Sequence, residues 1–323
     1  MASDLASPVR LPPNALLIAG PTAVGKSEIA FQLARELNGE IISVDSMQVY
    51  RGMDIGTAKP SQEQRAQVRH HLIDVVEMHE SFNAALFVEL ATRALAEINN
   101  RGAVPIFCGG TGLYFKALIE GLSGAPPGNK ELRDQLERIS DDELLSELAQ
   151  TDPVMFQRID QRNRRRVIRA VEVIRVTGKP YSMQRADWQH KTDKNSDGPR
   201  LIGLIRPSGE LNRRIESRVE SMFRSGLVEE TQALVARGLL ENPTAMQALG
   251  YRQVVESFKN KRSLPQTIEL VKIRTRQFAK RQMTWFKTQA VVDWISLGPD
   301  MAANLANVRL HIQNSRKNHL SSK

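Results

Sequence analysis

The sequence predicts an α/β protein in which a parallel sheet is interrupted by a mostly helical insertion. Short, largely apolar runs at residues 16–19, 40–44 and 104–108 have the length of buried parallel strands. Apolar residues at helical spacing follow the first run over residues 25–37 and precede the third over residues 84–98. This alternation favours right-handed crossovers between parallel strands. The carboxyl ends of the strands should therefore meet at one edge of the sheet, where open α/β sheets place their ligands.

The composition of the chain changes after residue 122. Residues 124–128 read Gly-Ala-Pro-Pro-Gly, a turn-rich hinge, and helical patterns follow over residues 130–176. Residues 187–199, rich in Asp, Lys, Asn and Gly, predict a surface loop, and residues 200–205 predict a strand that returns to the sheet.

The end of the chain is predicted to be mostly helical. Ser208 is expected to cap the helix that follows it, helices continue to residue 289, and a last strand is expected near residues 291–295. The predicted organisation is a disordered leader (1–13), an α/β core (14–123 and 200–300), a helical insertion domain (124–199) and a C-terminal helix and tail (301–323), with residues 315–323 disordered.

Composition and charge narrow the functional classes. The chain has 323 residues, of which 41% are hydrophobic, and no run of eighteen apolar residues that would cross a membrane. A single cysteine, Cys108, excludes an internal disulfide and a cysteine-rich zinc site. The net charge of +9 attracts polyanions, although it is equally compatible with a well-solvated surface. We expect a cytoplasmic protein, since the first residues lack the apolar core of a secretory signal. We also expect a monomer with no membrane partner.

A glycine-rich motif follows the first predicted strand and opens the first predicted helix. It matches the pattern G-x-x-x-x-G-K-[ST] in full and makes the core P-loop NTPase-like, the class that includes ATP- and other nucleotide-binding proteins. Backbone amides and the helix N-terminus of such a loop surround a phosphate, the lysine adds a point charge, and the hydroxyl of Ser27 can bind Mg²⁺. The predicted diphosphate-binding residues are Gly20, Pro21, Thr22, Ala23, Val24, Gly25, Lys26 and Ser27.

The motif identifies a phosphate rather than a reaction. An ATPase normally carries an acidic residue at the end of a later strand to help hold Mg²⁺. Here the third strand leads into Gly109-Gly110-Thr111, with no carboxylate. A small-molecule kinase that uses ATP remains an alternative, and so does a non-catalytic RNA-binding protein, which would have no use for Lys26, Ser27 and Asp45 together.

Several motifs in a fixed order resemble those of one enzyme family. They are GPTAVGKS at residues 20–27, DSMQVYRGMDIGTAKP at 45–60, HHLID at 70–74, GGTGLYFKAL at 109–118, RAVEV at 169–173, GYRQ at 250–253 and TRQFAKRQMTWF at 275–286. Together they span about residues 16–295 and closely resemble the tRNA dimethylallyltransferases, also called tRNA isopentenyltransferases, in the bacterial form without a zinc finger. The resemblance implies transfer of a dimethylallyl group from dimethylallyl diphosphate to N6 of the adenosine 3′ of the anticodon, with Mg²⁺ as cofactor, in tRNAs that read codons beginning with U.

The resemblance also implies the catalytic residues. Asp45 takes the place of the family's general base toward the exocyclic amine, whose lone pair is delocalised into the ring and needs such help. The alternative is that Asp45 caps a helix or supports Mg²⁺ indirectly. Thr111 falls where the family places a side chain near the transferring centre, and Arg218 resembles a diphosphate clamp, which would stabilise the charge that builds on the leaving oxygens.

An arginine-rich segment predicts a surface for RNA. Placed on a helix, Arg162, Arg165, Arg166 and Arg169 share one face, while Val167, Ala170, Val171 and Ile174 form an apolar flank. The alternative is a solubilising face. The resemblance implies tRNA contact, although many family members read Pro-Asn-Asp where this chain has Gln161-Arg162-Asn163. The implied tRNA-binding residues are Asp45, Ser46, Met47, Gln48, Thr111, Arg133, Arg165, Arg166, Val167, Ile168, Arg169, Gln247, Ala248, Leu249, Gly250, Tyr251, Arg252, Arg281, Trp285 and Lys287.

Three further residues have mainly structural interpretations. His70 and His71 have no acidic or cysteine neighbours at ligand spacing and are expected to be structural rather than metal ligands. For Trp285, a place in the core is at least as compatible with the sequence as stacking on a base.

Overall fold

The computed structural model describes residues 7–122, 125–184, 200–260 and 262–321. The chain divides into two compact units, a smaller one of residues 1–8 and 120–189 and a larger one of residues 9–119 and 190–323. The loop expected at residues 187–199 and the first six residues of the expected leader lie outside the described residues. Of the rest of that leader, Val9 donates its amide to the carbonyl of Leu118 at 2.9 Å.

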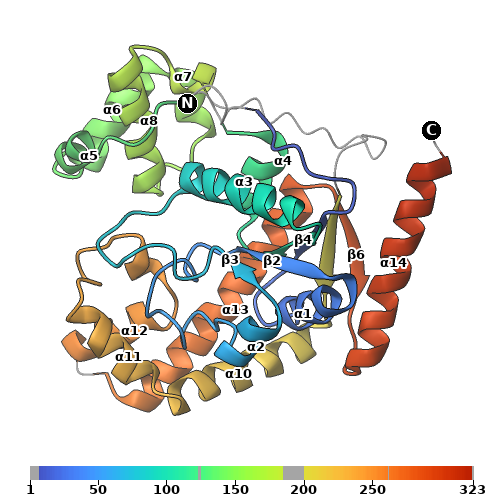
Figure 1. Cartoon of the computed structure of the whole chain (residues 1–323). Coiled ribbons are helices and arrows are strands. Elements are labelled where there is room, and N and C mark those ends of the chain that lie inside the picture. Colours follow the sequence, from blue (N-terminus) through green and yellow to red (C-terminus); the bar gives the residue numbers. More distant parts are fainter. Residues whose placement is uncertain (1–6, 123–124, 185–199, 261, 322–323) are drawn as a thin grey trace. The chain divides into compact units, whose positions relative to one another are not determined.

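The larger unit is built on a six-stranded, wholly parallel sheet, as the sequence predicted. Its strand order is β3-β2-β4-β1-β5-β6 (Figure 1). The strands predicted from the apolar runs are confirmed, and one short edge strand, β3, was not predicted because two residues carry no recognisable pattern. The bounds are β1 Leu16–Ala19, β2 Gly39–Val44, β3 His70–His71, β4 Val104–Gly109, β5 Leu201–Ile205 and β6 Val292–Ser296.

Helices cover both faces of this sheet. On one face, Leu16 and Ile18 of β1 pack in a buried cluster with Leu33 of α1 (Lys26–Leu37) and Val308 of α14 (Met301–Ser321). Alternate strand residues such as Leu17 are buried outside that cluster and point to the other face, where α3 (Ala84–Asn100) packs against β2 and β4. Figure 1 shows α1 and α3 on opposite sides of the strands. This two-sided burial explains why the strands read as continuous apolar runs.

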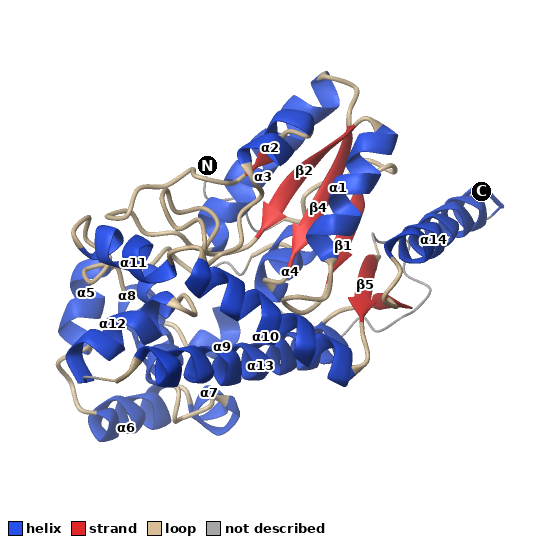
Figure 2. Ribbon diagram, turned by 90° about the horizontal axis from the view of Figure 1, so that it is seen from below, coloured by secondary structure: helices blue, strands red, loops and turns tan. Residues whose placement is uncertain are grey.

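Helices α10 to α13 complete the larger unit. Figure 2 shows α10 (Ser208–Arg224) and α13 (Leu264–Gln289) side by side, in agreement with their contacts. Two expectations for this part were wrong. Ser208 is the first helical residue of α10 rather than its cap, since Pro207 holds the cap position, and α14 continues as helix to Ser321 through the expected disordered tail. The remaining elements are α2 Gln62–Gln67, α4 Gly112–Glu120, α11 Leu227–Val235, η2 Ala245–Gln247 and α12 Tyr251–Asn260.

The smaller unit is helical, as predicted, and has a core of its own. Buried leucines Leu136, Leu144 and Leu148 pack against Val167 and Val171. Local signals start the helices: Ser140 and Glu143 form a reciprocal capping box at α6, and the carboxylate of Asp152 caps α7. The helices are α5 Lys130–Leu136, α6 Asp141–Thr151, α7 Pro153–Arg158, α8 Arg164–Thr177 and α9 Tyr181–Gln184.

A membrane span is not found in the described part of the chain, because none of its helices is both long and apolar enough to cross a bilayer.

Candidate active site

The sheet register brings the three predicted site segments together. In the paired strands, Val44 of β2 lies beside Gly109 of β4, and Gly109 lies beside Ala19 of β1. Each of these residues is the last of its strand. Asp45, Gly110 and Gly20 therefore leave the sheet as neighbours at its carboxyl edge, as expected for a ligand site in an open parallel sheet.

The phosphate-binding loop between β1 and α1 has the left-handed backbone that such loops need. Gly20, Ala23 and Gly25 have φ angles of 147°, 63° and 111°. A Cβ atom on Gly20 would lie 2.6 Å from the carbonyl oxygen of Leu204, so only glycine fits there. Successive amides in this conformation can turn toward an anion while their carbonyls point away.

Two arginines hold the outward carbonyls of the loop. Arg206, after β5, donates through Nε to the carbonyl of Val24 at 2.7 Å, and Arg214 of α10 donates through Nε to the carbonyl of Ala23 at 2.9 Å. These contacts fix the loop without occupying its inner face. These two contacts could not be predicted from the sequence, because each arginine lies more than 180 residues from its partner.

Lys26 lies inside the loop as a shielded cation. Its Nζ donates to the carbonyl of Pro21 at 2.7 Å. Burial lowers the pKa of Lys26 to about 8, and the nearby charge of Arg218 acts in the same direction. A phosphate that entered the loop would favour the charged form and reverse this shift. Ser27, the next residue, has an exposed side chain at the first turn of α1.

Arg218 of α10 also contacts the phosphate-binding loop. Its Nη1 lies 3.5 Å from the hydroxyl of Thr22. Burial lowers the pKa of Arg218, an effect that Glu28 opposes and Arg214 reinforces. Its guanidinium stays protonated because arginine titrates far above neutral pH. The structure thus brings Lys26 and Arg218, predicted separately from distant motifs, to the same loop.

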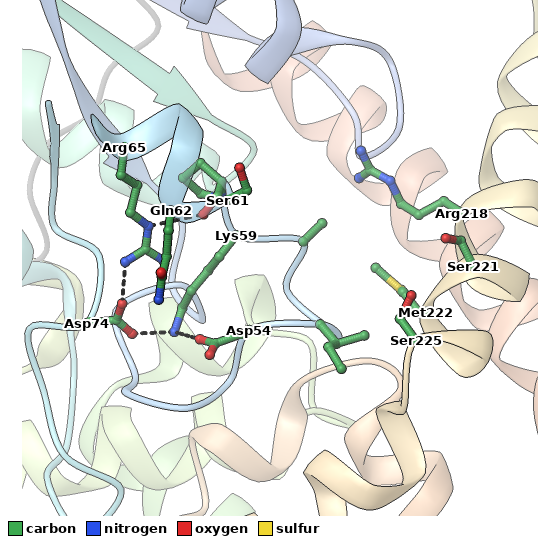
Figure 3. Close-up of a pocket in the computed structure, with 13 residues that line it drawn as sticks. Asp54, Lys59, Ser61, Gln62, Arg65, Asp74, Arg218, Ser221, Met222 and Ser225 are labelled. Atoms are coloured by element: carbon green, nitrogen blue, oxygen red, sulfur yellow. Dashed lines mark hydrogen bonds and ion pairs between the residues drawn. The ribbon is translucent and has the colours of Figure 1, made fainter. Parts of the chain in front are cut away.

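Arg218 also lines a cavity of about 630 Å³. Figure 3 shows Arg218, Ser221 and Met222 on one wall, from α10, and Lys59 and Asp74 on the facing wall. A cavity of this size can hold a small organic group next to a diphosphate. It is therefore a candidate space for a substrate next to the phosphate loop.

The facing wall is fixed by a network of charges around Lys59. Its buried ammonium donates to the Tyr50 carbonyl at 2.6 Å, to Asp54 at 2.7 Å and to Asp74 at 2.5 Å. Burial acts to raise the pKa of Asp74, but hydrogen bonds from Lys59 and Arg65 outweigh it and lower the pKa. The network ties residues 50–54 to residue 74 and gives the wall a defined position.

Asp45 is half-buried at the end of β2. Its Oδ1 accepts hydrogen bonds from the amides of Met47 at 2.8 Å and Gln48 at 3.2 Å. Among the described residues, none donates to its Oδ2, which leaves one carboxylate oxygen for a substrate. The capping role and the general-base role are thus compatible, because the turn uses one oxygen and fixes the direction of the other.

Gln48 and Thr111 both make hydrogen bonds close to Asp45 in the chain. Gln48 accepts a hydrogen bond from the Ser43 hydroxyl at 2.8 Å and donates to the carbonyl of Thr57 at 3.1 Å, so it supports the turn from within the protein. The amide of Thr111 donates to the carbonyl of Val44 at 3.2 Å. This bond fixes the loop after β4 directly beside the catalytic candidate.

Gln282 of α13 is a site residue that the sequence analysis missed. Its Oε1 accepts from the amide of Thr22 at 2.8 Å, and its Nε2 donates to the carbonyl of Gly110 at 2.9 Å. The partners lie 260 and 172 residues away. A buried glutamine within a basic helical motif could have drawn attention, but its contacts could not be predicted from the sequence.

The predicted tRNA-binding residues fall into exposed and buried groups. Arg165, Arg166, Gln247, Arg252, Arg281 and Lys287 have exposed side chains. Val167, Ile168, Ala248, Gly250 and Tyr251 are buried, so that any contact with RNA there would come from the backbone. Ser46, Met47 and Leu249 are half-buried, as is Trp285, whose ring packs against Gly112 and edge-on to Phe286.

Two predicted tRNA contacts have partners within the smaller unit. Arg133 and Arg169 both bind the carboxylate of Glu172, at 2.9 Å and 2.7 Å, and Glu172 is fully buried. Burial acts to raise the pKa of Glu172, but the two arginines outweigh it and lower the pKa. The predicted arginine face of this helix was wrong at its first residue. Helix α8 begins at Arg164 with Asn163 as its cap, so Arg162 lies outside the helix.

The paired histidines both make polar contacts within the protein. His71 contacts the carboxylate of Glu40 at 2.6 Å, Arg101 binds the same carboxylate, and His70 contacts the carbonyl of Val68 at 2.7 Å. The described residues contain no cluster of three or more His, Cys, Asp or Glu side chains that could hold a metal ion. Cys108 is a buried core residue, and burial raises the pKa of its thiol to about 11.

The fold and the site define a P-loop α/β protein. Its phosphate loop faces a carboxylate across neighbouring strand ends, next to a cavity. Comparison with known proteins narrows this class. Residues 48–289 match the family model described as IPP transferase.

Curated relatives agree with the family model. Over 297 residues the chain is 43% identical to tRNA dimethylallyltransferase 1 of Trichlorobacter lovleyi, covering 91% of this chain and 96% of that protein. It is also 43% identical to the tRNA dimethylallyltransferase of Anoxybacillus flavithermus, covering 88% and 91% of the two chains.

Solved structures are similar as well. The tRNA isopentenylpyrophosphate transferase of Bacillus halodurans matches with a TM-score of 0.68 at 37% identity, over 96% of this chain and 99% of that one. A eukaryotic dimethylallyltransferase acting on tRNA matches with a TM-score of 0.76 at 26% identity, over 96% and 80%. The chain therefore belongs to the IPP transferase family, the family of the tRNA dimethylallyltransferases.

Proposed function

We propose that this enzyme transfers a dimethylallyl group from dimethylallyl diphosphate to N6 of the adenosine on the 3′ side of the anticodon in tRNAs that read codons beginning with U. As a member of its family, the chain is a prenyltransferase that acts on tRNA. The proposal adds the identity of the donor, the atom that accepts the group, and the residues that bind the substrates and catalyse the transfer.

The phosphate loop is the proposed site of the donor's diphosphate. Departure of diphosphate builds negative charge on its oxygens, and Lys26, Arg218 and the loop amides all lie where they would stabilise that charge. The proposed cofactor is Mg²⁺, an ion that keeps several waters and binds mainly through substrate phosphates. Mg²⁺ bound to the diphosphate and the Ser27 hydroxyl would add further charge stabilisation.

Asp45 is the proposed general base. The new bond forms between N6 of the adenine and the allylic carbon, the bond between that carbon and the diphosphate oxygen breaks, and the proton leaves N6 for Oδ2 of Asp45. The amides of Met47 and Gln48 hold Oδ1, so Oδ2 keeps a fixed direction. The products are the N6-dimethylallyl adenosine and diphosphate, and the carboxylate is regenerated when the proton passes to solvent.

The acceptor base must leave its stack to reach this carboxylate, as it does in other enzymes that modify bases. The exposed cations Arg165 and Arg166 in the smaller unit, and Arg281 and Lys287 in the larger, are proposed to neutralise phosphates of the anticodon stem-loop. We expect the enzyme to act in the cytoplasm, where tRNA resides. We expect it to act as a monomer, because the residues proposed to bind the donor and the acceptor all belong to one chain.

One observation carries the proposal. The proposal is supported by three neighbouring strand ends at one edge of the sheet, which lead into residues 20–27, into Asp45 and into Gly110-Thr111. Among the described residues, none donates to Oδ2 of Asp45. A small-molecule kinase would need the loop for ATP, and an RNA-binding protein would need neither the buried lysine nor the oriented carboxylate.

Mass analysis of nucleosides tests the proposal. Unmodified tRNA is incubated with the enzyme, dimethylallyl diphosphate and Mg²⁺, digested and analysed. We expect an adenosine heavier by one C5H8 unit at the position 3′ of the anticodon. A parallel incubation with ATP in place of the prenyl donor should yield no product. Unmodified tRNA together with turnover of ATP would contradict the proposal and favour the kinase.

A further inference from the structure

Gln282 joins two loops of the site that are far apart in the sequence. Its side-chain amide accepts from the backbone of Thr22 and donates to the backbone of Gly110, at 2.8 Å and 2.9 Å. The residue is only 9% exposed, and both bonds are partly buried. A partly buried bond is costly to lose where its partners are left unsatisfied.

Each of the two loops carries one half of the proposed reaction. Thr22 belongs to the phosphate loop, and its hydroxyl faces Arg218. Gly110 precedes Thr111, whose amide binds the carbonyl of Val44 next to Asp45. The bridge through Gln282 therefore connects the leaving-group side of the site to the general-base side.

The backbone is shaped to admit this bridge. A Cβ atom on Gly110 would lie 2.2 Å from Nε2 of Gln282, and a Cβ atom on Gly112 would lie 2.0 Å from the ring of Trp285. Gln282 and Trp285 are three residues apart on α13 and share one helical face. The glycines after β4 thus let α13 approach the loop closely enough for a direct hydrogen bond.

We propose that Gln282 is a positioning residue for the transfer. It sets the separation between the diphosphate in the phosphate loop and the nucleobase beside Asp45, and it does so without touching either substrate. The proposal rests on the proposed function. Small displacements between reacting groups lower the rate steeply while each substrate keeps its own binding contacts, so loss of the bridge should affect kcat far more than affinity.

Three variants separate positioning from general stabilisation. Gln282→Met keeps the size of the side chain and removes both bonds. Gln282→Glu can form both bonds only when its carboxyl is protonated, since a carboxylate cannot donate to the Gly110 carbonyl. Gln277→Met makes the same change at an exposed position of the same helix and serves as the control.

We expect Gln282→Met to lower kcat for transfer by about 10- to 100-fold, the loss typical of a misplaced reacting group. The dissociation constants for tRNA and for inorganic pyrophosphate should stay within about threefold of wild type, because the side chain of Gln282 bonds to backbone atoms of Thr22 and Gly110. Gln277→Met should match wild type. All rates are referred to the concentration of active sites, so that a partly unfolded sample does not imitate a slow enzyme.

The pH profile of Gln282→Glu gives a second, independent test. Its kcat relative to wild type should rise as the pH falls, because protonation restores the donor, whereas the same ratio for Gln282→Met should stay flat. If Gln282→Met does not fold, this profile decides alone. A flat ratio for Gln282→Glu, or a kcat for Gln282→Met equal to wild type, would overturn the positioning role. Wild-type enzyme without transfer activity would instead overturn the proposed function, and this inference with it.

Discussion

The protonation of Lys26 should make the binding of diphosphate by the loop depend on pH. In the free enzyme, burial lowers its pKa to about 8. The protonated ammonium is the form proposed to bind diphosphate, and this form is present below that pH and lost as the pH rises through it. A bound diphosphate favours the charged form and raises the pKa again.

We therefore expect kcat/KM for dimethylallyl diphosphate to fall above pH about 8, because this ratio reports the free enzyme. kcat should fall only at higher pH, since it reports the enzyme with donor bound. Steady-state kinetics between pH 6.5 and about 9.5 measure both. Lys26→Gln should be slow at every pH and lack the fall near 8. A wild-type profile that is flat through this range would show that Lys26 does not supply the charge.

Asp45 gives a second prediction at this scale. Asp45→Asn keeps an oxygen for the amides of Met47 and Gln48 but removes the proton acceptor. Transfer should slow by about 10²- to 10⁴-fold, the usual contribution of a general base. Affinity for tRNA should change little, because other surfaces provide it. Single-turnover measurements with saturating donor report the chemical step, and a rate near wild type would leave Asp45 with the capping role alone.

The sequence predicted Lys26 from the glycine-rich motif, and it indicated the roles of Asp45 and Arg218 through the family resemblance. It did not predict Arg206, Arg214 or Gln282, which hold the loop from positions more than 180 residues away in the chain. Their roles consist of hydrogen bonds to backbone atoms. A backbone partner leaves no residue type in the sequence by which it could be recognised.

Helix α8 shows the same limit for a whole element. Its apolar flank, including Val167 and Val171, is buried as predicted from the helical period. Its arginines look alike in the sequence yet differ in the structure. Arg164 binds Glu137, Arg169 binds Glu172 and Arg175 binds Glu147, whereas Arg165 and Arg166 are exposed and have no ion pair among the described residues.

The two exposed arginines give a prediction for this element. Replacing Arg165 and Arg166 together with alanine should weaken tRNA binding and reduce the log–log salt slope by about one unit per lost phosphate contact. Filter binding or anisotropy across a range of KCl concentrations measures the slope.

Arg175→Ala is the matched control on the same helix. It removes one positive charge that is already paired with Glu147, so it should lower thermal stability slightly and leave the slope nearly unchanged. An unaltered slope in the double variant would make Arg165 and Arg166 part of a solvated surface and place the RNA elsewhere.

Across the whole molecule, the α/β class, the parallel sheet and the helical insertion follow from periodicity and turn signals. The same signals fail where an element is very short or where a helix is only weakly amphipathic. The two residues of β3 carry no pattern, and the last helix continues to Ser321 although its sequence is weakly amphipathic. Net charge of +9 agrees with a polyanionic substrate but does not say which face receives it.

The central claim is that the phosphate loop holds a leaving diphosphate rather than ATP. A single reaction that contains unmodified tRNA, Mg²⁺, dimethylallyl diphosphate and ATP tests it most directly, with pyrophosphate, ADP and modified adenosine quantified together. We expect one pyrophosphate for each dimethylallyl adenosine formed, with ATP intact. Formation of ADP while dimethylallyl diphosphate remains unconsumed would contradict the account.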